Sequence, residues 1–397
     1  MMLRGALVRV ARFSLVTTFV TSSSLVCAAG TVGAEIAISV NDNKLALVNG
    51  VGTVVQNPAP DTVTIIDLGA SPPRVLAEIP APASVVGPPL SVAITPDERL
   101  ALVTSAMKIN PSDPTKQVPD NRVSVIDLTS RPPRVLATLE AGAGAAGVSI
   151  NRRGTLALVA NRSEGTVSVF GIQGQMVTPL GKVTVGPADS GVSHVAITPD
   201  GKRALVTRDN DHFVSVLTID GTKVELAKRD ISAGLRPYGI DISRDGSVAV
   251  VANIGRGGGD SDTISLIDLA ATPPRVVETV TVGQTPEGIK LSPDGTLAAV
   301  VMMNGSNKAR ESPFYNDAGQ LLLYRVQGKR LIPVAAAWIG HWSQGVAFSA
   351  DGRTILVGNM VERNVQVLRW DGQQLKDQGE RIRVNGGSAA VRTADKP

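Results

Sequence analysis

Short apolar runs separated by a Pro-Asp-Gly turn recur along the whole chain. Residues 195–207 read as one apolar strand, the turn at Pro199, Asp200 and Gly201, and a second apolar strand. Close variants occupy residues 92–104, 148–160, 240–252, 289–301 and 346–358, and residues 36–49 form a looser copy. Seven copies of one two-strand pattern indicate an internal repeat.

Each repeat continues into a third and a fourth strand. Alternating segments rich in β-branched residues predict the third strands at residues 62–68, 122–128, 166–172, 213–219, 263–269, 320–326 and 364–370. Tight hairpins at Gly174, Gly221, Gly328 and Gly372 lead to the fourth strand in four repeats. The other three repeats carry Pro-Pro-Arg-Val there, and proline cannot donate to a strand ladder, so we expect the fourth strand at an outer edge.

The repeat length of about 45 to 57 residues is typical of propeller blades. We therefore predict an all-β fold, a seven-bladed β-propeller of four-stranded antiparallel blades, with blades starting near residues 35, 91, 147, 194, 239, 288 and 345. A parallel β-helix or a β-sandwich is the alternative. Residues 35–39 and 388–393 both align with a first strand, giving eight candidates for seven inner positions. We expect the two ends of the chain to meet at the first blade.

The first 34 residues have the pattern of a secretory signal. Arg4, Arg9 and Arg12 precede an apolar run at residues 13–26, and small residues follow. Cleavage after Ala34 is preferred to cleavage after Ala29. The run is too short for a membrane-spanning helix, so we expect a periplasmic or secreted protein without a stable membrane span after cleavage. An uncleaved anchor and a lipoprotein processed at Cys27 are the alternatives.

Removal of this segment changes the charge and the cysteine count. Without the three arginines of residues 1–34, the net charge of +4 falls to +1. Near-neutral charge and an aromatic content of 3% argue against nucleic acid as a partner. Cys27 is the only cysteine, so the processed chain has neither disulfides nor a catalytic thiolate.

Three second strands end in similar motifs, Leu-Val-Ala-Asn161, Val-Val-Ala-Asn253 and Leu-Val-Gly-Asn359. With the preceding turns and the following Thr-Val-Ser-Val-like strands, they resemble the YVTN family of β-propeller repeat proteins. Gly50, Ser105, Arg208 and Met302 replace the asparagine in the other repeats. The resemblance implies a seven-bladed propeller, usually exported, and leaves the function open because the family's functions are mixed.

In a propeller, the loops that join successive blades share one face with the loops between second and third strands. The second-to-third-strand loops are long at residues 51–61, 106–121, 254–262 and 303–319, and short at Arg162, Asp209 and Met360. We therefore predict a walled groove across the channel mouth, open towards blades three and four. Binding residues favour loops on a rigid scaffold. The candidate ligand-binding residues are His194, Arg236, Tyr238, Glu287, His341 and Trp342.

The remaining motifs give weaker evidence for a function. Asp241 and Lys290 hold equivalent inner positions in neighbouring blades, and we expect an inter-blade ion pair or channel lining because a solitary buried charge is costly. The glycine-rich segment 142–147 fits a dinucleotide fingerprint but precedes a strand and opens no helix. The aspartates at 209, 211, 260 and 262 lack an EF-hand context. We expect no cofactor and assign no metal site.

Two functions from different classes follow. The leading expectation is a non-enzymatic exported scaffold whose loop-rich face binds a protein, a peptide or an envelope component, with a small molecule as a further ligand class. The alternative is a hydrolase resembling seven-bladed propeller lactonases. In it Glu287 or His341 would be the general base, and Arg236 would stabilise the developing oxyanion. A role in an exported redox system rests on family analogy alone.

Overall fold

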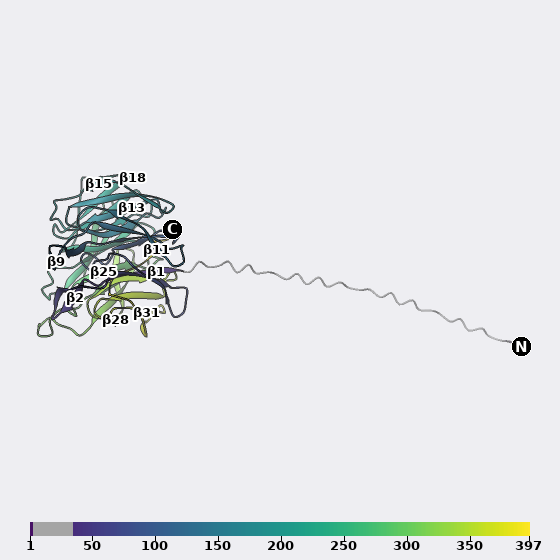
Figure 1. Cartoon of the computed structure of the whole chain (residues 1–397). Helices are drawn as coiled ribbons and strands as arrows, with labels where there is room; N and C mark the ends of the chain where they lie inside the picture. The colour runs from purple at the N-terminus through teal and green to yellow at the C-terminus, as the bar shows by residue number, and fades with distance from the viewer. Residues whose placement is uncertain (3–34) are drawn as a thin grey trace. The chain divides into compact units, whose positions relative to one another are not determined.

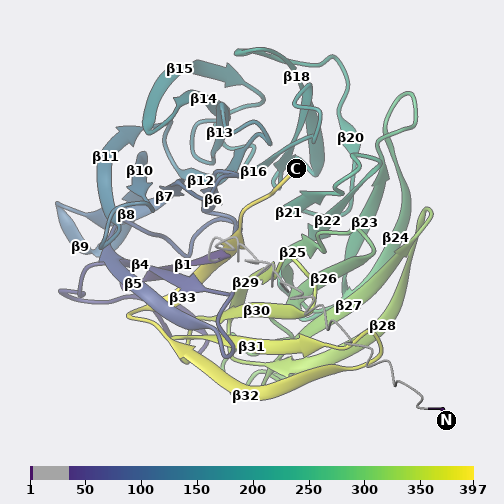
Figure 2. The same ribbon diagram turned by 90° about the vertical axis from the view of Figure 1, so that its right-hand side faces the viewer.

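A computed structural model describes Met1, Met2 and residues 35–397. The signal sequence proposed for residues 1–34 lies almost entirely outside the described residues. In residues 35–397 every regular element is a β-strand, and seven four-stranded antiparallel sheets stand around a common axis, so the predicted seven-bladed propeller is confirmed (Figures 1 and 2). In the described part of the chain, no helix is present that could cross a membrane.

The blades follow the chain in order from the second blade onwards. Blade two consists of β6 (Val92–Ile94), β7 (Leu100–Thr104), β10 (Arg122–Asp127) and β11 (Arg134–Glu140). Blade three consists of β12 (Ala145–Ile150), β13 (Leu156–Asn161), β14 (Thr166–Gln173) and β15 (Met176–Thr184). Blade four consists of β16 (Val192–Ile197), β17 (Arg203–Arg208), β18 (Phe213–Asp220) and β19 (Lys223–Leu226), with β20 (Ile231–Ser232) also paired to β18.

Blades five to seven repeat the same order without insertions into the sheet. Blade five consists of β21 (Pro237–Ile242), β22 (Val248–Asn253), β23 (Asp262–Asp268) and β24 (Arg275–Gly283). Blade six consists of β25 (Pro286–Leu291), β26 (Leu297–Met302), β27 (Gly319–Gln327) and β28 (Arg330–Ile339). Blade seven consists of β29 (Ser343–Phe348), β30 (Thr354–Asn359), β31 (Asn364–Trp370) and β32 (Leu375–Arg383). All seven predicted third strands are present within a residue or two of the expected bounds.

The first blade joins the two ends of the described chain. Its order is β33 (Gly387–Thr393), β1 (Ile36–Asp42), β4 (Thr62–Asp67) and β5 (Arg74–Pro80). β33 is the innermost strand and pairs antiparallel with β1, with Ala37 opposite Thr393. The expected meeting of the ends at blade one is therefore confirmed. The placement of residue 36 in a first, innermost strand is wrong, because β1 is the second strand.

A buried asparagine explains this correction. Asn161 ends the second strand of blade three, and its side-chain amide donates to Thr166 and Ser168 on the third strand. Asn41 at the end of β1 donates in the same way to Thr62 and Thr64. Asn41, and not Gly50, is therefore the first blade's equivalent of this asparagine.

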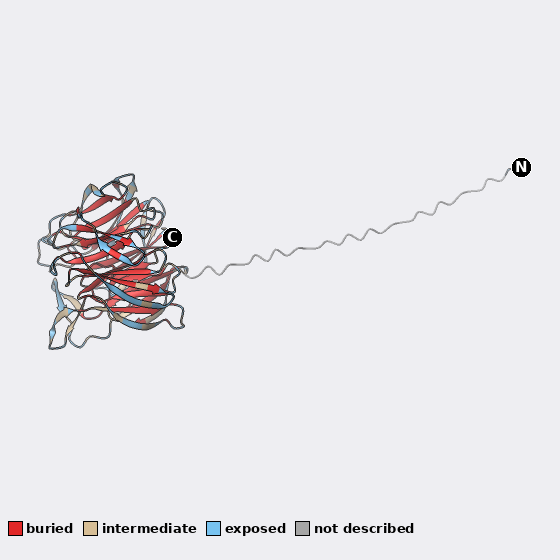
Figure 3. Ribbon diagram, turned by 90° about the horizontal axis from the view of Figure 1, so that it is seen from above, coloured by how far each residue is buried: buried red, intermediate tan, exposed pale blue. Residues whose placement is uncertain are grey.

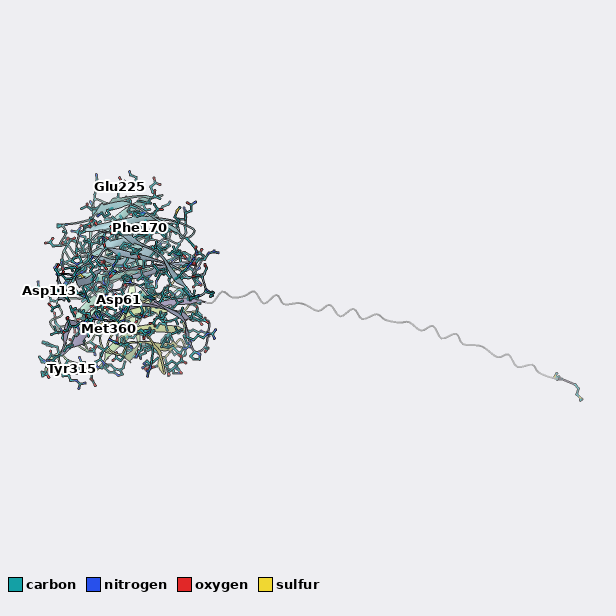
Figure 4. The ribbon with its side chains drawn as sticks, viewed as in Figure 1. Asp61, Asp113, Phe170, Glu225, Tyr315 and Met360 are labelled. Atoms are coloured by element: carbon teal, nitrogen blue, oxygen red, sulfur yellow. The ribbon has the colours of Figure 1, made fainter. Side chains whose placement is uncertain are left out.

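Residues 45–54 are consequently free to form a separate hairpin above the ring. It consists of β2 (Leu45–Val48) and β3 (Val51–Val54), and a second extra hairpin, β8 (Met107–Asn110) with β9 (Asp113–Pro119), stands on blade two. β2 and β9 lie on one side of the ring in Figure 1, and the C-terminal end lies on the other. Figure 4 places Asp113 and Tyr315 on the same side as the hairpins.

The long loops touch one another above the ring. Gly50, at the tip of the β2–β3 hairpin, has a φ of 74°, and a Cβ there would lie 2.2 Å from the backbone nitrogen of Ala309. Lys308 in turn donates to the carbonyl oxygen of Gly257. The loops of blades one, six and five are thus linked by direct contacts, and the short loops of blades three and four stand beside them.

The core lies between neighbouring blades. Figure 3 shows buried residues along the inner strands and exposed residues on the outer strands. β10 is buried along most of its length, whereas residues of β11 alternate between partial and full exposure. The fourth strands are outer edges in the sheets of all seven blades, as the Pro-Pro-Arg-Val segments predict for three of them.

Candidate active site at the channel mouth

Equivalent residues of three neighbouring blades line the mouth of the channel. Tyr238, Glu287 and Gln344 are each the second residue of an innermost strand, in β21, β25 and β29. Each strand is entered through a non-glycine residue with positive φ, namely Arg236 (57°), Thr285 (52°) and Trp342 (49°). Backbone in this region is strained for such residues, and strain of this kind is concentrated at functional sites.

Two arginines and one aspartate form the polar centre of this mouth. Arg162 and Asp209 directly follow the second strands β13 and β17, and Arg236 precedes β21. The Oδ2 atom of Asp209 accepts from Arg162 Nη2 and Arg236 Nη2, both at 2.8 Å. The Asp209 side chain is fully buried, while the Arg162 and Arg236 side chains are 19% and 31% exposed. Arg162 also lies 5.4 Å from the centre of the Tyr238 ring.

Glu287 is the titratable group of the site. Its carboxyl is surrounded by protein, and this burial raises its pKa to about 8. The Gln344 amide and the charges of Arg162 and Arg236 act in the opposite direction, with smaller effects. The arginines compensate Glu287 incompletely because both already bind Asp209. Glu287 therefore changes protonation close to neutral pH, where a general acid–base catalyst is most effective.

Several buried polar atoms of the mouth have no protein partner among the described residues. They are Asp209 Oδ1, Arg236 Nε and both amide atoms of Gln344. Buried polar groups usually form hydrogen bonds, and those that do not need a reason. A cluster of them beside a perturbed carboxyl is typical of a site that binds a polar small molecule.

The opposite side of the mouth carries an apolar patch. Val85 lies on the loop between blades one and two, and packs on Met360 and Ala389, with Leu45 and Trp342 against them. The backbone N–H of Val85 also donates to Asp42, whose carboxylate lies 3.2 Å from the buried Lys44 Nζ. The side of the mouth over blades one and seven is therefore mixed, with an apolar patch beside a buried ion pair.

Trp342 belongs to this apolar patch, and His341 precedes it in the chain. The Nδ1 atom of His341 lies 2.6 Å from Glu362 Oε1, and its Nε2 atom lies 3.5 Å from Asp317 Oδ1. Trp342 donates its backbone N–H to Ser306 in the 303–319 loop. The structure brings Arg236, Tyr238 and Glu287 together, while the polar contacts recorded for His341 are to acidic residues outside that cluster.

His194 does not overhang the mouth as expected. It is 2% exposed and lines a small cavity with Arg392 and Asp241, towards the Pro-Asp-Gly turns. A Cβ at Gly147 of the preceding blade would lie 2.2 Å from its Nδ1 atom, so that glycine makes room for the imidazole. Burial and the nearby cations Arg392 and Lys290 hold the His194 pKa well below its usual value. The imidazole is therefore neutral at physiological pH.

The expected pair of Asp241 and Lys290 is present. Lys290 Nζ lies 3.1 Å from Asp241 Oδ2, and the Leu291 backbone N–H donates to the same oxygen at 2.8 Å. Both side chains are nearly buried, at 8% and 9% exposure. The pair joins blades five and six from inside the channel.

Sequence reasoning missed Arg162, Asp209 and Gln344 as site residues. Their positions in the repeat could have identified them, because Arg162 and Asp209 each follow the last residue of a second strand, and Gln344 aligns with Glu287. The motif Asp209-Asn-Asp211 hinted at calcium, but Asp209 instead binds two arginines. In residues 35–397, no group of three His, Cys, Asp or Glu side chains is arranged to hold a metal ion.

Comparison with known proteins finds similarity at the level of fold. No protein-family model and no curated protein matches the chain. Among solved structures, the periplasmic gluconolactonase of Pseudomonas aeruginosa is similar, with 18% identity, a TM-score of 0.64, and coverage of 91% of this chain and 100% of that one. A candidate 6-phosphogluconolactonase from Bacteroides fragilis has 18% identity, a TM-score of 0.69, and coverage of 92% and 99%.

The fold is also used for other chemistry. Hydrazine synthase of Kuenenia stuttgartiensis matches with 19% identity, a TM-score of 0.56, and coverage of 73% of this chain and 79% of that chain. Identities this low show the fold alone. The chain is thus a seven-bladed propeller with lactonase-like structural neighbours, and membership of the YVTN family is not shown.

These findings correct the leading functional expectation. A non-catalytic scaffold is disfavoured because similar solved structures carry gluconolactonase names. The findings favour the lactonase alternative instead.

Proposed function

We propose that this protein is a lactone hydrolase whose active site is the channel mouth. The observation that carries the proposal is Glu287, a carboxyl with a pKa of about 8 held beside two guanidinium groups. Ester hydrolysis needs a base for the attacking water and positive charge for the developing oxyanion. At the channel mouth, Glu287 can supply the base, and the two arginines can supply the positive charge. The lactonase names of structural neighbours support the same reaction class.

In this mechanism Glu287 acts in its carboxylate form. It accepts a proton from water while the water oxygen attacks the lactone carbonyl carbon. Arg236, with its unpartnered Nε, stabilises the negative charge that develops on the carbonyl oxygen. The bond from the carbonyl carbon to the ring oxygen then breaks, and Glu287 returns the proton to that oxygen. The product is the open hydroxy acid, which leaves as a carboxylate.

The site also favours a sugar-derived lactone as substrate. The unpartnered atoms of Asp209 and Gln344 offer a donor and acceptors for hydroxyl groups, and Arg162 lies beside them, over the Tyr238 ring. With Glu287 ionised, as the mechanism requires, the two arginines balance the charges of Glu287 and Asp209, so the mouth has no net charge to favour an anionic substrate over a neutral one. We propose an aldonolactone, with or without a phosphate group, as the substrate class.

We further propose that the enzyme works outside the cytoplasm. The basic and apolar pattern of residues 1–26 supports export, and one similar solved structure is a periplasmic enzyme. Fractionation of cells that express the full-length chain, followed by N-terminal sequencing of the extracted protein, tests this. Recovery of an intact N-terminus from the cytoplasmic fraction would contradict export.

The reaction is tested with glucono-δ-lactone and its 6-phosphate. Acid release is followed in a pH-stat and compared with spontaneous hydrolysis at each pH. We expect Glu287→Gln to lower kcat/KM by about 10²- to 10⁴-fold, the usual contribution of a general base.

Glu164→Gln is the matched control. Glu164 lies on the same face, in the short loop of blade three, and pairs with the exposed Lys182 at 2.6 Å. Glu164 also accepts from the Ala143 backbone N–H and from Thr166. We expect the kcat/KM of this variant to stay within about twofold of the unsubstituted protein, since a glutamine keeps the shape of the side chain and the lost ion pair with an exposed lysine contributes little. Equal rates for the unsubstituted protein, Glu287→Gln and buffer at every pH would reject the proposal.

A further inference from the structure

The channel has a second polar end, on the side of the Pro-Asp-Gly turns. A cavity of about 260 Å³ opens there, lined among others by Arg152, Arg244, Lys290, Asp241 and Asp395. A smaller cavity of about 30 Å³ adjoins it, and shares Arg152, Asp241 and Asp395 with it. Figure 2 shows the C-terminal segment running from the end of β33, near the middle of the ring, towards β16 and β21.

The carboxylate of Asp395 sits among buried cations. Its Oδ1 atom lies 2.7 Å from Lys290 Nζ, and its Oδ2 atom lies 2.9 Å from Arg392 Nη2. The Lys290 and Arg392 side chains are only 9% and 6% exposed. Their charges, with that of Arg152, hold the Asp395 pKa well below its usual range. The cluster is therefore built to hold a carboxylate.

The cluster is incompletely satisfied by Asp395. Arg392 Nε and Nη1 and His194 Nδ1 are buried and have no partner among the described residues. Arg392 and His194 both line the small cavity. Buried donors without acceptors are costly, and a guanidinium can bind two carboxylate oxygens side by side. A ligand carboxylate that replaced Asp395 and reached further into the small cavity would satisfy these atoms as well as Arg392 Nη2.

Asp395 is more exposed than the cations that it binds. Its side chain is 40% exposed, and it follows the last strand residue, Thr393. Of the acids that remain, Asp241 also binds Lys290, while Glu98 pairs with Lys396 and Glu35 accepts from the Ala350 backbone. If Asp395 moved away, the cations of this end would outnumber the nearby free carboxylates.

We propose that this end of the channel is a second binding site, for a small carboxylate, and that Asp395 occupies the position that the ligand carboxylate would take. A free ligand must compete with Asp395 for the same cations. Only the molecules in which Asp395 has left the site can bind the ligand, so the apparent affinity of the unsubstituted protein for the ligand is reduced in proportion to their fraction. The inference does not depend on the proposed lactonase reaction, because it concerns other residues and its measurement is binding.

The test uses the full chain and sodium malonate as the probe. Isothermal titration calorimetry should show that malonate binds Asp395→Ala about tenfold more tightly than the unsubstituted protein, because the internal competitor is gone. Malonate should also raise the melting temperature of Asp395→Ala above the value in sodium chloride of equal ionic strength. The double variant Asp395→Ala, Arg392→Met should lose both effects.

Asp371→Ala is the matched control. Asp371 forms an exposed ion pair with Lys376 at 3.0 Å on a blade turn, so its removal should create no malonate site. If Asp395→Ala does not fold, Asp395→Asn takes its place, with the same expected gain. The proposal would be overturned if malonate bound and stabilised the Asp371 variant as much as the Asp395 variants. It would also be overturned if malonate stabilised the Asp395 variants no more than sodium chloride does. Tighter binding of inorganic phosphate than of malonate would overturn its assignment to carboxylates.

Discussion

The two ends of the channel use the same kinds of side chain with opposite results. At the mouth, burial raises the pKa of Glu287 to about 8. At the other end, the pKa of Asp395 lies well below its usual range. Both acids have cations nearby, two for Glu287 and three for Asp395. The difference is direct contact, because Lys290 and Arg392 bind Asp395, whereas the mouth arginines bind Asp209. A third group can thus decide whether neighbouring charges stabilise a carboxylate.

After Glu287→Gln, the largest effect is expected from Arg236→Met at the mouth. Loss of the guanidinium removes the positive charge proposed for the oxyanion, which typically costs 10²- to 10³-fold in kcat. Steady-state rates with glucono-δ-lactone measure it. A change in KM alone would show that Arg236 only binds the ground state.

The next effect concerns stability at the opposite end. Lys290→Met leaves Asp241 buried and Asp395 without its nearest cation, so we expect the free energy of unfolding to fall by about 3 kcal/mol. Urea unfolding followed by circular dichroism measures the change. Lys376→Met, which removes one partner of an exposed pair, should cost less than about 1 kcal/mol. Similar losses in both variants would refute the contrast between buried and exposed pairs.

Asp209→Asn would make the mouth more like the other end. With Asp209 neutral, the two arginines act on Glu287 without compensation, so we expect its pKa to fall by about one to two units. Because the base must be deprotonated, activity rises with pH through this pKa, and the rising limb should move to lower pH. Carboxyl carbon NMR of Glu287 measures the pKa directly. An unchanged or higher value would refute the account of Asp209.

His341→Ala should give the smallest change. Its ring lies against Glu362 and Asp317, so we expect its loss to lower kcat/KM by less than about tenfold, well short of the loss expected for Glu287→Gln. Parallel rate measurements on both variants test the ranking. An equal loss would restore His341 as the general base considered from the sequence.

The repeat pattern was enough to predict the propeller, its blade count and most strands. It failed at the seam, where residues 36–49 imitate a strand pair but only β1 enters a blade. The buried partners of Asn41 decide that register, and they are 21 and 23 residues away in the sequence. Contacts between residues so far apart in the sequence cannot be predicted from the local pattern of apolar and polar residues.

The site was predictable in part. Arg236, Tyr238 and Glu287 stand out because they interrupt a pattern of small and apolar residues at the start of inner strands. His194 does so too, yet its side chain turns into the channel wall against Gly147. The pKa of Glu287 depends on which group the arginines bind, and that pairing between blades is a property of the folded ring.

The pairing of β33 with β1 has a consequence for synthesis. The first blade needs residues 37 and 393 side by side, so it cannot be completed until residue 393 has been made. Contacts of such long sequence separation form late because of their entropic cost. Until then β1 presents an unpaired edge to the surroundings, and a nascent chain would need either fast folding or a chaperone to avoid aggregation.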